Sequence, residues 1–140
     1  MTKTKTKTKT KTKTITKTKK RMRNFRKYDV WIDGMELVNS IYDVTEKLPN
    51  NERFALISQM TRSAISIPSN IAEGSGRNSE KDFARFLEFS LGSAYELETQ
   101  IRIAEKRKYI SSNNSSDIIE KLISLQKRIG ALRKSILNKN

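Results

Sequence analysis

Apolar side chains recur at helical spacing along the chain, and the first segment to show this covers residues 28–48. Its main stripe advances in steps of three, four and seven residues: Val30, Leu37, Ile41, Val44 and Leu48. This spacing places apolar side chains on one face of a helix, whereas a half-buried strand would alternate them. Pro49 and Asn50 follow the stripe and are predicted to end the helix.

A second helix is predicted from about residue 51, with apolar residues again three and four apart: Phe54, Ile57, Met60, Ala64, Ile65, Ile67, Ile71 and Ala72. Pro68 lies inside this segment. Because proline lacks a backbone donor and clashes with the carbonyl four residues earlier, the helix either stops before Pro68 or continues with a kink. The apolar phase continues beyond Pro68, which favours the kink, and Gly74 and Gly76 then predict the end of the helix.

A third helix is predicted to run to about Lys108, and Ser79 followed by Asp82 resembles a capping box at its start. Its apolar seam alternates steps of four and three: Phe83, Leu87, Ser90, Ala94, Leu97, Ile101 and Ala104. A second line lies roughly opposite the seam, at Phe89, Gly92 and Ile103. A monomeric bundle would not require apolar residues on this outer face, so the line is a candidate interface between copies of the chain.

The polar run 111–115 is predicted to be a loop, and Ser116 or Asp117 is predicted to cap a fourth helix. The stripe of this helix keeps one phase throughout: Ile118, Leu122, Leu125, Ile129, Leu132 and Ile136. No segment shows a strand pattern, and the three connections are short. The sequence therefore predicts an all-α fold, an up-down-up-down antiparallel four-helix bundle over residues 24–140, with its second helix kinked at Pro68.

Charge divides the chain into two parts. Of the net charge of +14, residues 1–23 contribute +11, since they hold nine Lys, two Arg and no acid. Residues 2–14 alternate Thr and Lys, and such a segment cannot bury enough apolar surface to fold, so residues 1–23 are predicted to be a disordered leader. Three interpretations stay open: an arm that holds phosphates, a solvated tail, or upstream DNA translated ahead of a true start at Met22.

The chain contains neither cysteine nor histidine. This excludes disulfides, thiolate nucleophiles, the usual imidazole base and ordinary zinc sites, so we expect no enzyme, no catalytic residue, no metal and no other cofactor. No run of about 18 apolar residues predicts a membrane span, and the first residues lack the apolar core of a secretory signal. We therefore expect a cytoplasmic protein without a membrane or small-molecule partner.

Asn70, Glu73 and Arg77 are three and four residues apart and would share one side of the second helix. Arg77 could contact a ligand or an RNA phosphate, or it could pair with Glu73, Glu96 or Glu98 and fix the packing of the bundle. The second interpretation is favoured. Glu96 and Glu98 lie on different faces of their helix, which disfavours a paired catalytic or metal site.

Two groups of basic residues are candidates for nucleic-acid binding. They are Arg102, Lys106, Arg107 and Lys108 near the end of the third helix, and Lys121, Lys127, Arg128, Arg133 and Lys134 on the fourth. Cations also complement a helix C-terminus, and charges spread around a polar face are often merely solvated, so both interpretations stay open. Most aromatic residues share the core phase, and no stacking platform for single strands is expected.

Two stretches, Ser-Ile-Pro-Ser-Asn-Ile-Ala-Glu-Gly-Ser-Gly-Arg at 66–77 and Ser-Leu-Gly-Ser-Ala-Tyr-Glu-Leu-Glu at 90–98, carry a family resemblance. They resemble the proteins read from intervening sequences of 23S ribosomal RNA genes, and the accessory variability determinant protein of diversity-generating retroelements. The resemblance covers about residues 25–137. It implies a four-helix bundle that assembles as a ring-like homopentamer.

The resemblance also implies residue roles. Asn70, Glu73, Gly74 and Arg77 would form a polar cluster at a helix end, and Gly92, Ser93 and Glu96 would pack helices closely. The retroelement members are basic rings that bind nucleic acid and a reverse transcriptase. The leader has no counterpart in the family.

Together these observations predict a noncatalytic homo-oligomer, a pentamer by resemblance, that binds RNA or a nucleoprotein through basic surfaces repeated around the assembly. The alternative is a protein-interaction scaffold that docks a partner enzyme such as a reverse transcriptase, without a nucleic-acid function of its own.

Overall fold

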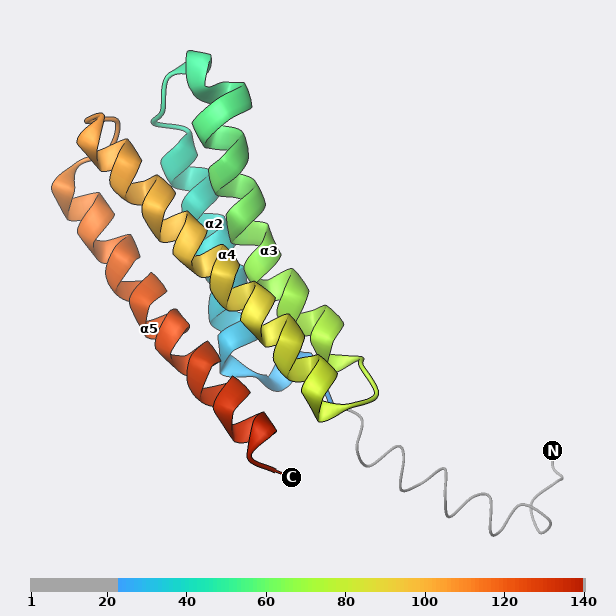
Figure 1. Cartoon of the computed structure of the whole chain (residues 1–140). Helices are drawn as coiled ribbons and strands as arrows, with labels where there is room; N and C mark the ends of the chain where they lie inside the picture. Colours follow the sequence, from blue (N-terminus) through green and yellow to red (C-terminus); the bar gives the residue numbers. More distant parts are fainter. Residues whose placement is uncertain (1–22, 140) are drawn as a thin grey trace, which may run out of the picture.

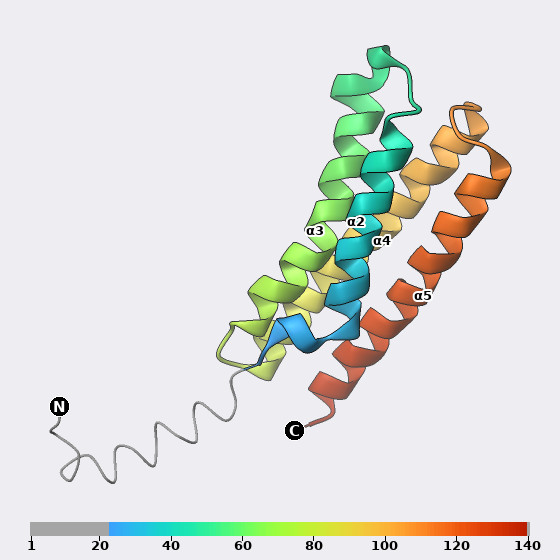
Figure 2. The same ribbon diagram turned by 180° about the vertical axis from the view of Figure 1, so that it is seen from behind.

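The computed structural model describes residues 23–139, which form four long helices and contain no strand. The long helices are α2 (Asp29–Thr45), α3 (Ser58–Ser75), α4 (Glu80–Lys106) and α5 (Ser112–Leu137). In Figures 1 and 2, α2 and α4 run one way along the bundle and α3 and α5 run the other way. The all-helical prediction is confirmed for these residues, and residues 1–22 of the predicted leader lie outside them.

The core forms where the predicted stripes meet. Every predicted stripe position of the first helix is buried, as is the whole seam of α4, including the polar Ser90. On α5 the stripe is buried except for Leu132, which is half-buried against the core. Burial of periodic apolar faces is therefore what holds the four helices together.

The second segment departs from its predicted pattern at two positions. Phe54 and Ile65 were both predicted on the apolar stripe, but both are exposed. The buried apolar stripe advances by four and three residues, at Met60, Ala64, Ile67 and Ile71, and Ser63 and Pro68 are buried beside it. Ile65 lies beside this line, and Phe54 precedes the helix, in a π-helical turn η3 (Arg53–Ile57) that follows a short 3₁₀ turn η2 (Asn50–Glu52).

Helix α3 continues through Pro68, and it ends at Ser75 with Gly76 as its C-cap. Pro68 is buried against α2 beside Gly34, where a β-carbon would make an ordinary contact of 3.5 Å with the Pro68 β-carbon. The bend that we predict at Pro68 stays a prediction.

Helix α5 begins earlier than predicted. The hydroxyl of Ser111 accepts a hydrogen bond from the Asn114 amide at 3.1 Å, so Ser111 is the N-cap, and the predicted caps Ser116 and Asp117 lie inside the helix. The reason is tertiary: Ser115 is buried and donates to Glu105 of α4 at 2.8 Å, which favours a helical turn over a solvated loop. Lys108, with a φ of 64°, closes the end of α4 in the left-handed conformation usually taken by glycine.

Candidate functional site

The predicted polar cluster is divided between two kinds of contact, and the first is a hydrogen-bonded seam between α3 and α4. Asn70 donates to the carbonyl and the hydroxyl of Ser66, at 2.9 and 2.8 Å, and the Ser66 and Ser93 hydroxyls lie 2.9 Å apart. One turn away, the buried Ser90 hydroxyl donates to the Ile67 carbonyl at 2.8 Å. Ser93 and Ser90 therefore join the two helices, and Asn70 orients Ser66 from within α3.

The second contact lies at the end of α3, where Arg77 pairs with Glu73 at 3.1 Å and its guanidinium lies 4.5 Å from the centre of the Phe86 ring. This is one of the pairings that the packing interpretation of Arg77 anticipates. Gly74 faces Phe86 as well, since a β-carbon there would come within 2.5 Å of the Phe86 β-carbon. Glu96 is exposed on α4 and makes no ion pair with Arg77 in the described part of the chain.

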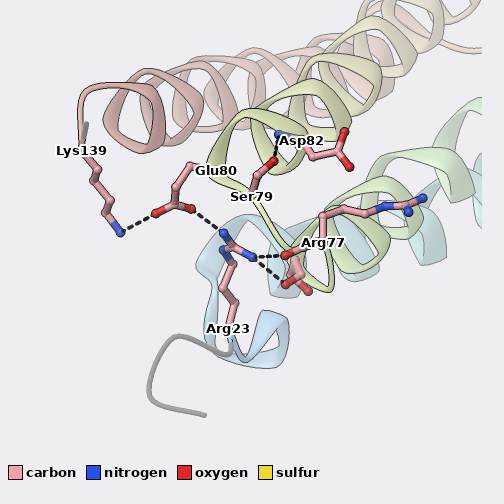
Figure 3. A network of polar contacts seen from close by, with 7 residues as sticks. Arg23, Arg77, Ser79, Glu80, Asp82 and Lys139 are labelled. Atoms are coloured by element: carbon pink, nitrogen blue, oxygen red, sulfur yellow. Dashed lines mark hydrogen bonds and ion pairs between the residues drawn. The ribbon is translucent and has the colours of Figure 1, made fainter. Parts of the chain in front are cut away.

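Arg23 joins the start of the described chain to the α3–α4 connection, and Glu80 links the same place to Lys139 near its end (Figure 3). Its guanidinium donates to the Ser75 and Arg77 carbonyls at 3.1 and 2.8 Å and pairs with Glu80, and it lies 4.6 Å from the centre of the Phe83 ring. Glu80 also approaches Lys139 at 3.9 Å. Arg23, the last residue of the predicted leader, thus contacts the fold directly, a role that the surrounding positive charge concealed.

Three of the nine candidate nucleic-acid-binding residues are paired with carboxylates. Arg102 meets Glu98 at 2.9 Å, Arg133 lies 3.6 Å from Glu88, and Arg128 bridges Asp29 and Asp33 of α2 at 2.8 and 2.7 Å. Burial lowers the pKa of Arg128, but the hydrogen bonds to the two aspartates more than offset it, so its pKa is raised. A guanidinium that already donates to two carboxylates has fewer donors left to bind a phosphate.

The carboxylate partners are also held in place. A hydrogen bond from Gln126 lowers the pKa of Glu98 most strongly, and Arg102 lowers it further. Gln126 donates to Glu98 at 2.9 Å and so links α5 to α4. Arg128 and Arg133 therefore join α5 to α2 and α4, whereas Arg102 pairs within α4 with a carboxylate that Gln126 of α5 also contacts.

The other six candidate binding residues are exposed and make no ion pair within residues 23–139: Lys106, Arg107, Lys108, Lys121, Lys127 and Lys134. Three of them cluster where α4 ends, and the other three are spread along α5. Lys127 and Lys134 are seven residues apart and share one face of the helix. The geometry can supply point charges to a polyanion.

A hollow of about 360 Å³ separates α2 from α5. Its floor is apolar, with Leu37 and Leu125, and its walls carry both signs of charge: Asp33, Glu36, Glu120, Lys121 and Arg128. Opposite charges here favour neither an anion nor a cation. Among the described residues no group of acidic side chains is placed to hold a metal ion.

The line Phe89, Gly92 and Ile103 lies on the outside of α4. Phe89 and Ile103 are both 45 % exposed, and a β-carbon on Gly92 would have no neighbour within 4 Å. Within one chain, Gly92 therefore does not make the close helix contact that the resemblance implies. Its role at an interface between copies stays a prediction.

The sequence pattern did not predict that Phe54 is exposed. We expected this residue in the core and expected no exposed aromatic platform, yet its side chain is 91 % exposed. The signal that could have revealed it is the polar run Asn50, Asn51, Glu52 and Arg53, which makes the first turn of this segment a poor continuation of an apolar stripe.

Comparison with known proteins places the chain in a family. The 23S rRNA-intervening sequence protein family matches residues 26–131. The chain belongs to this family. The match covers all four long helices except the last turns of α5.

A solved structure is similar to the fold. It is a protein of unknown function from the S23 ribosomal protein family of Bacteroides thetaiotaomicron, with a TM-score of 0.70 and 25 % identity, covering 75 % of this chain and 98 % of that one. No curated protein matches the chain. In the described part of the chain, no helix combines the length and the apolar character needed to cross a bilayer.

Proposed function

We propose that this member of the 23S rRNA-intervening sequence protein family is a noncatalytic homo-oligomer, a pentamer by resemblance, that binds RNA through basic surfaces repeated on each subunit. The observation that carries the proposal is the set of six exposed cations at the end of α4 and along α5. Each phosphate contact is weak, and repetition around an assembly multiplies such contacts into useful affinity.

The exposed apolar line on α4 supports the oligomer. Phe89 and Ile103 present large apolar side chains to solvent in a single chain, and Gly92 between them offers space for a second backbone to approach. Contact between copies would remove this surface from water and would use all three positions together.

The alternative, a scaffold that docks a partner enzyme without touching nucleic acid, is favoured by the pairing of Arg102, Arg128 and Arg133 with carboxylates. It predicts an oligomer with no affinity for RNA beyond that of the leader. The two functions therefore differ in how a chain that begins at Met22 behaves toward RNA.

The test combines oligomeric mass with RNA affinity. Light scattering after size exclusion should show a multiple of the chain mass, and Phe89→Glu should return the protein to a single chain because it introduces a charge into an apolar contact. Affinity for a structured RNA should fall steeply with salt. The triple variant K121Q/K127Q/K134Q should bind more weakly, and its salt slope should be smaller by about one for each phosphate that it no longer neutralises.

Lys81→Gln is the matched control, because Lys81 is exposed but lies outside both candidate groups. Its slope should equal that of the unmodified chain. Absence of RNA binding in the chain that begins at Met22 would contradict the proposed function and would favour the alternative, a scaffold for a partner enzyme. A single-chain mass would contradict the oligomer.

A further inference from the structure

Phe54 is far more exposed than any other large apolar side chain in residues 23–139. Its side chain is 91 % exposed, whereas the next, Tyr95, is 53 % exposed. Single exposed apolar residues are common on protein surfaces, but an almost wholly solvated phenylalanine leaves both faces of its ring free for contact.

The segment that carries Phe54 is anchored on both sides. Leu56 and Ile57, in the same π-helical turn, pack against the core, and the Glu52 side chain accepts a hydrogen bond from the Leu56 amide. The Tyr109 hydroxyl donates to the other oxygen of Glu52 at 2.9 Å. The ring is therefore exposed by a turn that is itself held in place, and π-helical turns occur frequently at functional sites.

Exposed cations lie at the same end of the bundle as Phe54. Arg53 precedes Phe54 and is exposed, and the Tyr109 contact brings the α4–α5 connection to the same end of the bundle, which Figure 1 shows at the top. That connection carries the exposed Lys106, Arg107 and Lys108, with the Arg107 guanidinium 5.8 Å from the centre of the Tyr109 ring. Glu52 and Glu105 at this end already accept hydrogen bonds from Tyr109 and Ser115.

An exposed aromatic ring beside several cations is the combination that binds unpaired nucleotides, because every base has a face that can stack and every nucleotide a phosphate to neutralise. We infer that this end of the bundle binds single-stranded RNA, with one unpaired base stacked on Phe54 and flanking phosphates held by Arg53, Arg107 and Lys108. The inference rests on the proposed function and names the class of RNA. A protein partner would meet one exposed ring at an end of the bundle that carries four exposed cations, which suits an apolar contact poorly.

The experiment uses the full chain and two labelled RNAs, a single strand of about 12 nucleotides without self-complementarity and the same strand annealed into a blunt duplex. Phe54→Ala should weaken single-strand binding by about tenfold, the weight of one stacked base, while duplex affinity and the salt slope stay unchanged because the variant removes no charge. Tyr42→Ala, which removes another exposed aromatic side chain, should change neither affinity.

Phe54→Trp supplies a direct signature of stacking. The chain has one other tryptophan, Trp31, so quenching that appears only in this variant on addition of the single strand reports a base against the new indole. Single-strand binding should also be retained, because an indole stacks at least as well as a phenyl ring.

The outcomes separate this inference from the function on which it rests. Equal single-strand affinity of the unmodified chain and Phe54→Ala, or no quenching in Phe54→Trp, would overturn the stacking site while RNA binding itself stood. A changed oligomeric mass of Phe54→Ala would assign the ring to a contact between copies and overturn it too. If the unmodified chain bound neither RNA, both proposals would fall.

Discussion

At the residue scale, Gly74 sets how closely α3 and α4 approach. A β-carbon at this position would lie 2.5 Å from the Phe86 β-carbon and 3.1 Å from a ring carbon of Phe83. The first of these atoms is attached directly to the backbone and cannot swing away. Any larger residue must therefore push the two helices apart.

Gly74→Ala should lower the free energy of unfolding by about 1–3 kcal/mol, the usual cost of forcing an extra carbon into a packed contact. Gly130→Ala is the matched control, since it adds the same atom within α5 where nothing lies within 4 Å. The control should gain about 0.5–1 kcal/mol from reduced backbone freedom. Urea unfolding followed by circular dichroism measures both, and equal effects of the two variants would contradict the close approach.

The sequence predicted Gly74 as a signal for the end of a helix, and α3 does end one residue later, at Ser75. Gly74 also leaves the space that Phe86 occupies, and Phe86 lies twelve positions away on another helix. Local sequence could not reveal this contact. The same holds for Arg77, whose partner Glu73 was foreseeable from a spacing of four but whose ring contact with Phe86 was not.

At the element scale, the start of α5 shows how a tertiary contact overrides local preference. Ser, Asn and Asp compete with the helical backbone and favour caps and loops, which is why residues 111–115 were predicted to be a loop. In the fold, the buried hydroxyl of Ser115 bonds Glu105, and the helix extends back to the next available cap.

Ser111→Ala should cost about 1 kcal/mol of stability, because it leaves the first turn of α5 without its cap. Ser116→Ala should change stability by less than about 0.5 kcal/mol, because Ser116 lies exposed inside the helix. Thermal unfolding of the two variants distinguishes the observed cap from one of those predicted. A larger loss in Ser116→Ala would place the start of the helix where the sequence suggested.

The first turn of the second segment differs from its prediction for a related reason. A π-helical turn holds more residues than an α-helical turn, so the side chains within it, including Phe54, are out of phase with the apolar stripe of α3. Phe54 fits the α-helical pattern in the sequence, but it is exposed in the structure. Periodicity predicts the direction of a side chain only while the period is constant.

At the scale of the whole molecule, Arg23 closes the bundle at the end where the described chain begins and finishes (Figure 3). One guanidinium donates to the carbonyl of Ser75 at the end of α3, to the carbonyl of Arg77 just after it, and to a carboxylate at the start of α4. Its side chain is only 14 % exposed, so these charge-assisted bonds are partly shielded from water.

Arg23→Met should lower the free energy of unfolding by about 2 kcal/mol, the range for hydrogen bonds to charged groups. Arg26→Met is the control, since the Arg26 side chain is exposed and hydrogen-bonds only Asn24 nearby. A chain that begins at Met22 keeps Arg23 and should unfold at the same temperature as the full chain. A clear loss of stability in that shorter chain would show that the leader supports the fold.

Sequence by itself determined the helical class, the four segments and most of the core, because the period of an apolar stripe is a local property that neighbouring residues record. It also located the excess charge. The tertiary structure alone decided which cations are paired across helices, where α5 starts and which way Phe54 faces. Those outcomes depend on distances between residues far apart in the chain, such as Arg128 from Asp29 or Tyr109 from Glu52, and no spacing along one helix contains them.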